Sequence, residues 1–258
     1  MPEDQEILFE LTDHIATITL NRPQKLNAVT SEMASIVNTY ALEYNEDTNV
    51  RVVVITGSGE KAFCAGSDIN DLDHYADPWV FRNRPDYCDA IRRLRKPTIC
   101  AVNGFCLGGG LELAMSCDIR IASGKAFFGA PEIKLGWVGG GGMSYFLAHA
   151  IGSSNAALML YTGDMIDAQQ ALNWRLVSEV VAPDKLLART KEIACTIVQR
   201  APIAAQTAKQ NLRAAYSMNR EDAIQYERDL QTICFATEDA AEGRQAFKDK
   251  RKANFRGR

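Results

Sequence analysis

The stretch Val102–Val138, VNGFCLGGGLELAMSCDIRIASGKAFFGAPEIKLGWV, decides the fold and carries most of the candidate chemistry. An apolar strand at its start turns through three consecutive glycines, Gly108–Gly110, into a short apolar helix. Glycine tolerates positive φ and lets a ligand approach the backbone closely, and a helix N-terminus favours negative charge. The turn therefore fits either a tight strand-to-helix connection or a site that holds an oxyanion.

The same stretch contains two carboxylates, Glu112 and Glu132, that stand among mostly apolar neighbours. Glu112 has no cationic residue nearby in the sequence, and Lys134 is too close along the chain to Glu132 to define a pair. Burial of an ionised carboxylate without a partner is costly and raises its pKa. Two such groups in one site can divide into an acid and a base. The local pattern leaves solvated side chains and an acid–base pair as alternatives.

Outward from this stretch, strands alternate with helices. Residues 7–11 and 15–20 alternate apolar and polar side chains, which predicts a hairpin. Residues 50–56, VRVVVIT, form a β-branched run typical of a strand covered on both faces. Residues 31–44 follow a helical period. The order strand, strand, helix recurs over roughly the first 180 residues, and it predicts α/β layers.

The last part of the chain has only helical patterns, with Pro202 at a seam. The final predicted helices cover residues 185–199, 203–214, 220–236 and 239–250. We therefore expect a core over residues 1–200 that contains the site, and a C-terminal helical region over residues 201–258.

Composition narrows the class of protein. The chain has 258 residues, a net charge of −3 and a pI near 5.7, so it lacks a basic footprint for nucleic acid. No apolar run reaches the ~18 residues that span a membrane, and the acidic N-terminus does not resemble a signal peptide. The seven cysteines form no CxxC pair and predict reduced core thiols in a cytoplasmic protein. The three scattered histidines suggest no metal site.

A second glycine-containing loop lies in KAFCAGSDI, Lys61–Ile69. Alone, this segment is a strand end that turns through Ala65 and Gly66. If it lies beside Gly108–Gly110, it can supply the second N–H group of an oxyanion hole.

Several motifs together resemble the enoyl-CoA hydratase/isomerase (crotonase) superfamily. They are KAFCAGSDI, AVNGFCLGGGLELAMSCDIRIAS, FGAPEIKLG, YTGDMIDAQQAL and EGRQAFKDKRKANF, and the resemblance is collinear from Leu20 to Phe255. It implies an α/β fold, a crotonase-type spiral of ββα units followed by a C-terminal helical trimerisation region. It also implies a homotrimer or a hexamer of two trimers, an acyl-CoA thioester substrate, and no metal or other cofactor, because coenzyme A is part of the substrate.

The resemblance also assigns candidate site residues. The backbone N–H groups of Ser67 and Gly109 match the oxyanion hole, which would stabilise an enolate. The matches along the acyl-CoA groove are Lys25, Leu26, Ala28, Ala65, Asp68, Ile69, Asn70 and Trp137. Phe247 and Lys250 match residues that reach the adenine and phosphate end of coenzyme A, often across a subunit boundary.

The two carboxylates indicate the reaction. Hydratases similar to this chain have glutamate at both positions, whereas isomerases often keep only the second. Glu112 would act as the base on a water molecule, and Glu132 would protonate the α-carbon of a 2-enoyl-CoA. Each such contribution is worth roughly 100- to 10,000-fold in rate. The resemblance therefore favours a hydro-lyase, in keeping with the acid–base chemistry of the pair.

The segment WVGGGGMSYF departs from the common hydratase pattern. Gly139 replaces a proline, and Gly140 stands where a backbone N–H group helps to hold the catalytic water. The glycines and the larger Trp137 suggest a looser wall, or room for a bulky acyl group. Two alternatives follow: an isomerase or lyase that acts on a bulky acyl-CoA, and a non-catalytic binding module of the same fold. The acidic pI and the retained carboxylates argue against the binding module.

Overall fold

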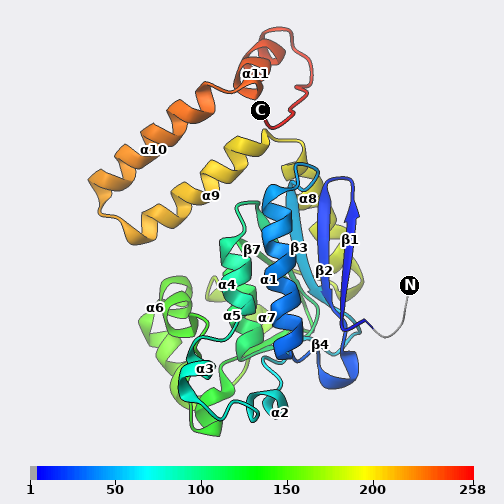
Figure 1. Ribbon diagram of the computed structural model, residues 1–258, viewed down its shortest axis with the longest axis vertical. Coiled ribbons are helices and arrows are strands. Elements are labelled where there is room, and N and C mark those ends of the chain that lie inside the picture. The colour runs from blue at the N-terminus through cyan, green and yellow to red at the C-terminus, as the bar shows by residue number, and fades with distance from the viewer. Residues whose placement is uncertain (1–4) are drawn as a thin grey trace.

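A computed structural model describes residues 5–258 as two β-sheets, the helices around them and a C-terminal group of helices (Figure 1). The first four residues of the acidic N-terminus lie outside the described part. No helix in the described part is long and apolar enough to cross a membrane.

The larger sheet has six strands in the order β1-β2-β3-β5-β7-β10. Its strands are β1 (Ile7–Thr12), β2 (Ile15–Leu20), β3 (Val52–Gly57), β5 (Thr98–Val102), β7 (Ile119–Ser123) and β10 (Glu179–Val181). The antiparallel pair of β1 and β2 confirms the predicted hairpin, and the other neighbours are parallel. The β2–β3 register sets Ile15 opposite Val52.

The smaller sheet has four strands in the order β4-β6-β8-β9. They are β4 (Ala62–Cys64), β6 (Phe105–Leu107), β8 (Phe127–Gly129) and β9 (Ile166–Asp167). Of each consecutive pair β3/β4, β5/β6 and β7/β8, the first strand joins the larger sheet and the second joins the smaller one. This repetition confirms the predicted spiral of strand pairs and helices.

Helices cover both faces of the larger sheet. Those of the layered part are α1 (Ser31–Glu46), α2 (Ile69–Leu72), α3 (Pro78–Arg82), α4 (Tyr87–Arg93), α5 (Gly109–Ser116), α6 (Met143–Thr162), α7 (Ala168–Asn173) and α8 (Leu186–Val198), with 3-10 turns η1 (Pro23–Lys25), η2 (Pro131–Leu135) and η3 (Pro183–Lys185). Val53 and Ile55 of β3 belong to the core that includes α1, α4 and α5. Val52 and Val54 pack in a second core with Leu186 of α8. The β-branched run is therefore buried on both faces, as its pattern predicts.

Local sequence signals explain where the main helices begin and break. Thr30 caps α1, because its side chain accepts a hydrogen bond from the N–H group of Met33. Gly152, at φ 77°, interrupts α6, because this positive φ favours glycine. The short elements β6, β9, α2 and α3 have too few residues to show a period, and the sequence does not predict them.

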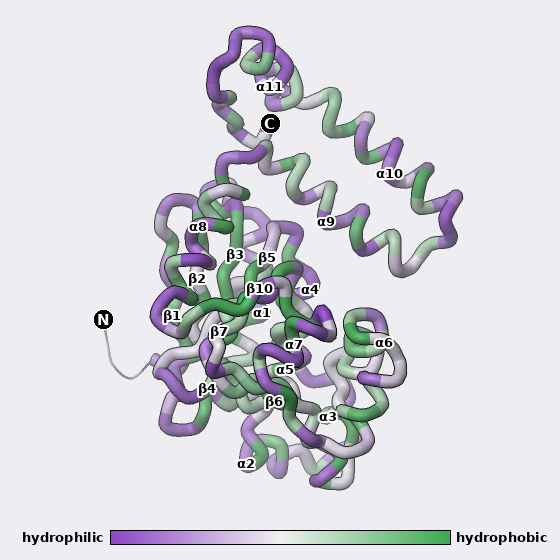
Figure 2. Tube along the Cα trace, turned by 180° about the vertical axis from the view of Figure 1, so that it is seen from behind, coloured by the Kyte–Doolittle hydropathy of each residue, from purple (hydrophilic) through white to green (hydrophobic). Residues whose placement is uncertain are grey.

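The C-terminal helices extend away from the layers, as Figures 1 and 2 show. They are α9 (Pro202–Ser217), α10 (Arg220–Phe235) and α11 (Glu238–Lys248). The buried Lys209 of α9 pairs with Asp118 at 2.7 Å and donates to the carbonyl of Lys96, which ties this group to the larger sheet. Large apolar side chains on these helices remain exposed: Leu212, Tyr216, Ile233, Phe235 and Phe247. The division into two domains at residue 200 stays a prediction.

Candidate active site

Glu112 lies in the first turn of α5, immediately after the glycine turn, and its side chain is buried. One carboxylate oxygen, Oε1, accepts hydrogen bonds from the N–H groups of Gly141 at 2.7 Å and Met143 at 3.1 Å. Burial raises the pKa of this carboxyl group, the two N–H donors oppose the rise, and the negative charge of Glu132 adds to it. The donors stabilise the ionised form, which suits a base.

The glycine loop fits closely around this carboxylate. A Cβ atom on Gly139 would lie 2.7 Å from Glu112 Oε1, and one on Gly141 would lie 2.8 Å from Oε2. Arg92 of α4 donates to the carbonyl of Gly141 at 2.6 Å and thereby holds the loop in place. The interpretation of these glycines as vacant room is wrong at positions 139 and 141, because the Glu112 carboxylate fills that space.

Gly140 differs from its neighbours, since a Cβ atom there would meet nothing within 4 Å. The hydrogen bonds from this loop to Glu112 come instead from Gly141 and Met143. The role of Gly140 in holding a water molecule stays a prediction.

Glu132 lies in η2, directly after Pro131, with its side chain 9% exposed. Its Oε2 atom is buried and has no hydrogen-bond partner within residues 5–258. Burial raises the pKa of this carboxyl group as well. Gly108 faces it at φ 55°, where a Cβ atom would lie 3.0 Å from Glu132 Oε1. The glycine turn is thus required both by backbone conformation and by the close approach of Glu132.

The two glycine loops meet beside these carboxylates. A Cβ atom on Gly66, whose φ is 102°, would lie 3.1 Å from the backbone nitrogen of Gly109. In the described part of the chain, the N–H groups of Ser67 and Gly109 form no hydrogen bond. Two unused N–H donors on touching loops can bind the oxygen of a polarised carbonyl.

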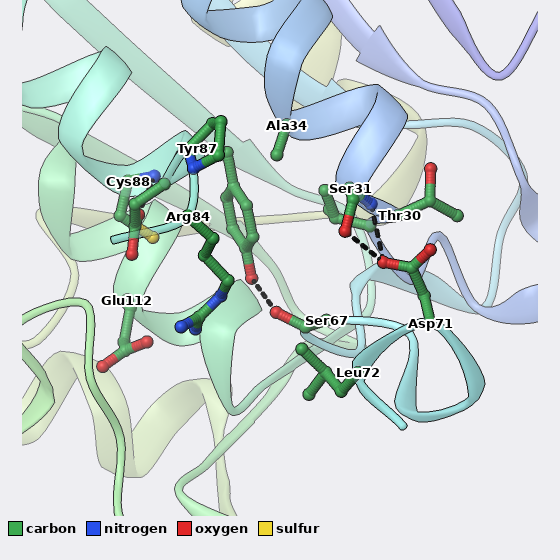
Figure 3. A pocket seen from close by; sticks show the side chains of 13 residues that line it. Thr30, Ser31, Ala34, Ser67, Asp71, Leu72, Arg84, Tyr87, Cys88 and Glu112 are labelled. Atoms are coloured by element: carbon green, nitrogen blue, oxygen red, sulfur yellow. Dashed lines mark hydrogen bonds between the residues drawn. The ribbon is translucent and has the colours of Figure 1, made fainter. Parts of the chain in front are cut away.

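A narrow pocket with a cavity volume of about 30 Å³ opens next to this arrangement. Its lining includes Ser67, Glu112, Arg84 and Tyr87, as Figure 3 shows. The hydroxyl groups of Tyr87 and Ser67 lie 3.2 Å apart. Burial raises the pKa of Tyr87 well above its usual value, so its hydroxyl group stays protonated and able to donate.

The structure also brings together most of the predicted groove. The chain from Leu26 to Val29 runs beside Ala65 to Ser67, with Ala65 N donating to Leu26 O and Val29 paired with Ser67. Lys25 and Ala28 lie in this segment. The substrate contacts predicted for these residues stay predictions.

The residues that follow Ser67 either form hydrogen bonds within the chain or are exposed to solvent. Asp68 accepts a hydrogen bond from Arg22 at 2.9 Å, and this bond holds the pKa of Asp68 below its ordinary value. Asp68 also caps α2 through the N–H group of Asn70, and Ile69 is 48% exposed. Trp137 follows η2 and is half-exposed.

Phe247 and Lys250 lie at the other end of the molecule, on and just after α11 (Figure 1). Within one chain the structure does not bring them to the glutamates. Phe247 is 86% exposed, which leaves it available to a second subunit.

Sequence reasoning gave no role to several residues that the structure places at the site. They are Arg84, Tyr87, Arg92, Gly141 and Met143. The four-glycine run signals the loop but does not distinguish among its N–H groups. The three side chains come from the mixed segment over residues 71–95, where no pattern indicates which of them point inward.

Comparisons with known proteins show the family of this chain. A family profile described as Enoyl-CoA hydratase/isomerase matches residues 10–258. The chain is 42% identical to a probable enoyl-CoA hydratase, EchA8, of Mycobacterium tuberculosis, over 97% of this chain and 98% of that protein. It is 37% identical to a crotonyl-CoA hydratase of Syntrophomonas wolfei, with the same coverage. The crystal structure of an enoyl-CoA hydratase from Bacillus anthracis superposes with a TM-score of 0.93 at 34% identity, covering 98% of this chain and all of the other.

Proposed function

Because the chain belongs to the enoyl-CoA hydratase/isomerase family, we propose that it hydrates a 2-enoyl-CoA thioester to a 3-hydroxyacyl-CoA. The same site catalyses the reverse dehydration. The observation that carries this proposal is the pair of buried glutamates, of which Glu112 accepts two N–H bonds and Glu132 keeps one oxygen without a partner. The difference between the two environments suits one base and one acid.

The chemistry starts at the thioester carbonyl. The N–H groups of Ser67 and Gly109 bind its oxygen and stabilise the negative charge that develops there. Glu112 takes a proton from a water molecule while the water oxygen forms a bond to C3, and the C2–C3 π electrons move into an enolate. Glu132 then delivers its proton to C2. The product contains one added water, and a return proton transfer resets the two carboxyl groups.

Each carboxyl group must begin in the correct state. Glu112 starts ionised and Glu132 starts protonated, which matches the two N–H donors to the first and the unpartnered buried oxygen of the second. Acid, base and N–H donors are sufficient for hydration, so the proposed reaction uses no cofactor beyond the coenzyme A of the substrate.

The remaining proposals concern assembly and location. The exposed apolar side chains of α9–α11 support a homotrimer or a hexamer of two trimers, because large exposed apolar surfaces are typical of sites of protein–protein contact. In that assembly Phe247 and Lys250 contact the coenzyme A bound by a neighbouring subunit. Seven cysteines without a disulfide, five of them buried, support a reducing, cytoplasmic location.

The experiment that tests this function compares the Glu112→Gln and Glu132→Gln variants with the natural chain in hydration of crotonyl-CoA. Each variant should lose roughly 100- to 10,000-fold in kcat. Glu43→Gln is the matched control, because Glu43 is exposed on α1 and should retain the natural rate. Full activity of either site variant would contradict the proposal.

The same assay separates the alternatives when products are weighed. Hydration adds the mass of one water, isomerisation adds nothing, and a lyase yields two smaller products. Retention of both glutamates favours hydration. A binding module would bind coenzyme A thioesters without turning any of them over.

A further inference from the structure

The connection between α3 and α4 carries a cationic side chain, Arg84, into the pocket beside Glu112. Figure 3 shows this side chain extending into the space between Glu112 and the Tyr87–Ser67 pair. These residues come from three separate segments of the chain. The fold therefore places a positive charge next to the position of the reacting acyl group.

Contacts with Phe81 hold the Arg84 side chain in position. The guanidinium carbon lies 4.0 Å from the centre of the Phe81 ring, and Nη1 donates to the Phe81 carbonyl at 2.7 Å. The Phe81 ring packs edge-on against Tyr75. Within residues 5–258, this is the only hydrogen bond of the guanidinium, and no carboxylate forms an ion pair with it.

The acidic side chains that share the pocket are engaged elsewhere. Asp71 accepts hydrogen bonds from the N–H and hydroxyl groups of Ser31. Asp86 caps α4 by accepting from the N–H groups of Cys88 and Asp89. Glu112 accepts from the glycine loop. None of these carboxylates pairs directly with Arg84, so the remaining N–H groups of its guanidinium are free to bind a ligand.

The lining as a whole suits a polar acyl group. Ser67 and Tyr87 contribute hydroxyl groups on the side of the guanidinium, whereas Thr30 and Ser31 line the opposite side of the pocket. A plain alkyl chain in this space would remove water from the guanidinium and offer no partner, which is unfavourable. A carboxylate would instead match the fork of N–H groups on arginine.

We propose that Arg84 makes this pocket selective for 2-enoyl-CoA substrates whose acyl group ends in a carboxylate. The substrate class is thus the monothioester of an unsaturated dicarboxylic acid, with its free carboxylate bound by Arg84 and the Tyr87 hydroxyl nearby. This inference rests on the proposed function, because the double bond must lie at Glu112 and Glu132. The inference adds that the end of the acyl group far from the thioester is a carboxylate.

Two substrates of nearly equal length provide the test. Crotonyl-CoA ends in a methyl group, and glutaconyl-CoA carries a carboxylate on that carbon. The natural chain should hydrate glutaconyl-CoA with a kcat/KM at least about tenfold higher. The Arg84→Gln variant should lose at least about tenfold in kcat/KM for glutaconyl-CoA, mostly through KM, and stay within about threefold of the natural chain for crotonyl-CoA. Arg84→Lys should recover part of the loss.

Arg82→Gln is the matched control, because Arg82 is exposed on α3 and does not line the pocket. It should leave both substrates unchanged. Equal effects of Arg84→Gln on the two substrates, or a natural preference for crotonyl-CoA, would overturn this inference while leaving hydration intact. If the natural chain hydrates neither substrate, the proposed function itself fails.

Discussion

The parts of the molecule that hold Glu112 and Glu132 are built differently. Glu112 stands on a helix, and a loop of glycines closes on it with two N–H donors. Glu132 stands on a 3-10 turn after a proline, and its buried Oε2 has no partner within residues 5–258. Burial is the main cause that raises the pKa of both groups, and the negative charge of Glu132 adds to the rise at Glu112.

This comparison indicates how one residue type can serve two roles. Hydrogen bonds from N–H groups favour the ionised carboxylate, whereas burial without a donor favours the protonated acid. The surroundings of the two carboxylates therefore distinguish base from acid, since the residues themselves are identical. Substitutions that alter the surroundings of one glutamate and leave those of the other unchanged test this assignment of acid and base.

The largest effect should come from filling the space against Glu112. The Gly141→Ala variant puts a methyl group where the Glu112 carboxylate lies, 2.8 Å from Oε2, so the base must move. A displacement of this order costs about 100-fold in rate. Steady-state hydration of crotonyl-CoA measures the loss, and circular dichroism checks that the variant is folded.

Gly140→Ala is the control for this experiment, because its methyl group would meet nothing within 4 Å. It should keep most of the activity. Equal losses in the two variants would mean that the close fit around Glu112 does not set its position.

A smaller loss should follow from releasing the glycine loop. Arg92→Gln removes the charged donor from the carbonyl of Gly141 and from Ser116. Hydrogen bonds to charged groups are worth about 1.5–3 kcal/mol, so a decrease of roughly tenfold in kcat is expected. Because Gly141 is then held less firmly, its N–H group stabilises the Glu112 carboxylate less and the pKa of Glu112 rises. The acid limb of the pH–rate profile should therefore also move to higher pH. Arg93→Gln, on the exposed side of α4, should change neither quantity.

The smallest effect concerns stability and its dependence on pH. A carboxyl group with a raised pKa binds its proton more tightly in the folded state, so it costs stability once pH exceeds its unfolded pKa. Glu132→Gln removes this cost and should raise Tm at pH 7 by roughly 2–4 °C. The gain should vanish near pH 4, where the carboxyl group is largely protonated in both states.

Glu112→Gln should raise Tm less, because the Glu112 carboxylate already receives two N–H bonds. Thermal unfolding at both pH values measures the difference between the variants. A larger rise in Tm for Glu112→Gln than for Glu132→Gln would contradict this comparison, because it would mean that the Glu112 carboxylate costs more stability than the Glu132 carboxylate.

Much of the layered fold could be predicted from the sequence. The hairpin over residues 7–20 follows from alternation, and β3 follows from an unbroken β-branched run that both cores cover. The Thr30 side chain caps α1, and Gly152 interrupts α6 at a positive φ that favours glycine. These features depend on neighbours along the chain, so local patterns contain them.

The details of the site could be predicted only in part. The two glutamates could be predicted as candidate site residues because a charged side chain is unusual in an apolar run. The partners of Glu112 come from 29 and 31 residues away in a loop, so no local pattern assigns them. Arg84 lies in an irregular segment whose direction depends on packing against Phe81. Contacts between distant segments decide these positions.

One measurement tests most directly the claim that Glu132 is the acid and Glu112 the base. Butyryl-CoA lacks the double bond, so water cannot add to it, but its C2 proton can exchange with D2O through the enolate. The natural chain and the Glu112→Gln variant should incorporate deuterium at C2, while Glu132→Gln should not. Exchange that survives in Glu132→Gln and disappears in Glu112→Gln would contradict the assignment.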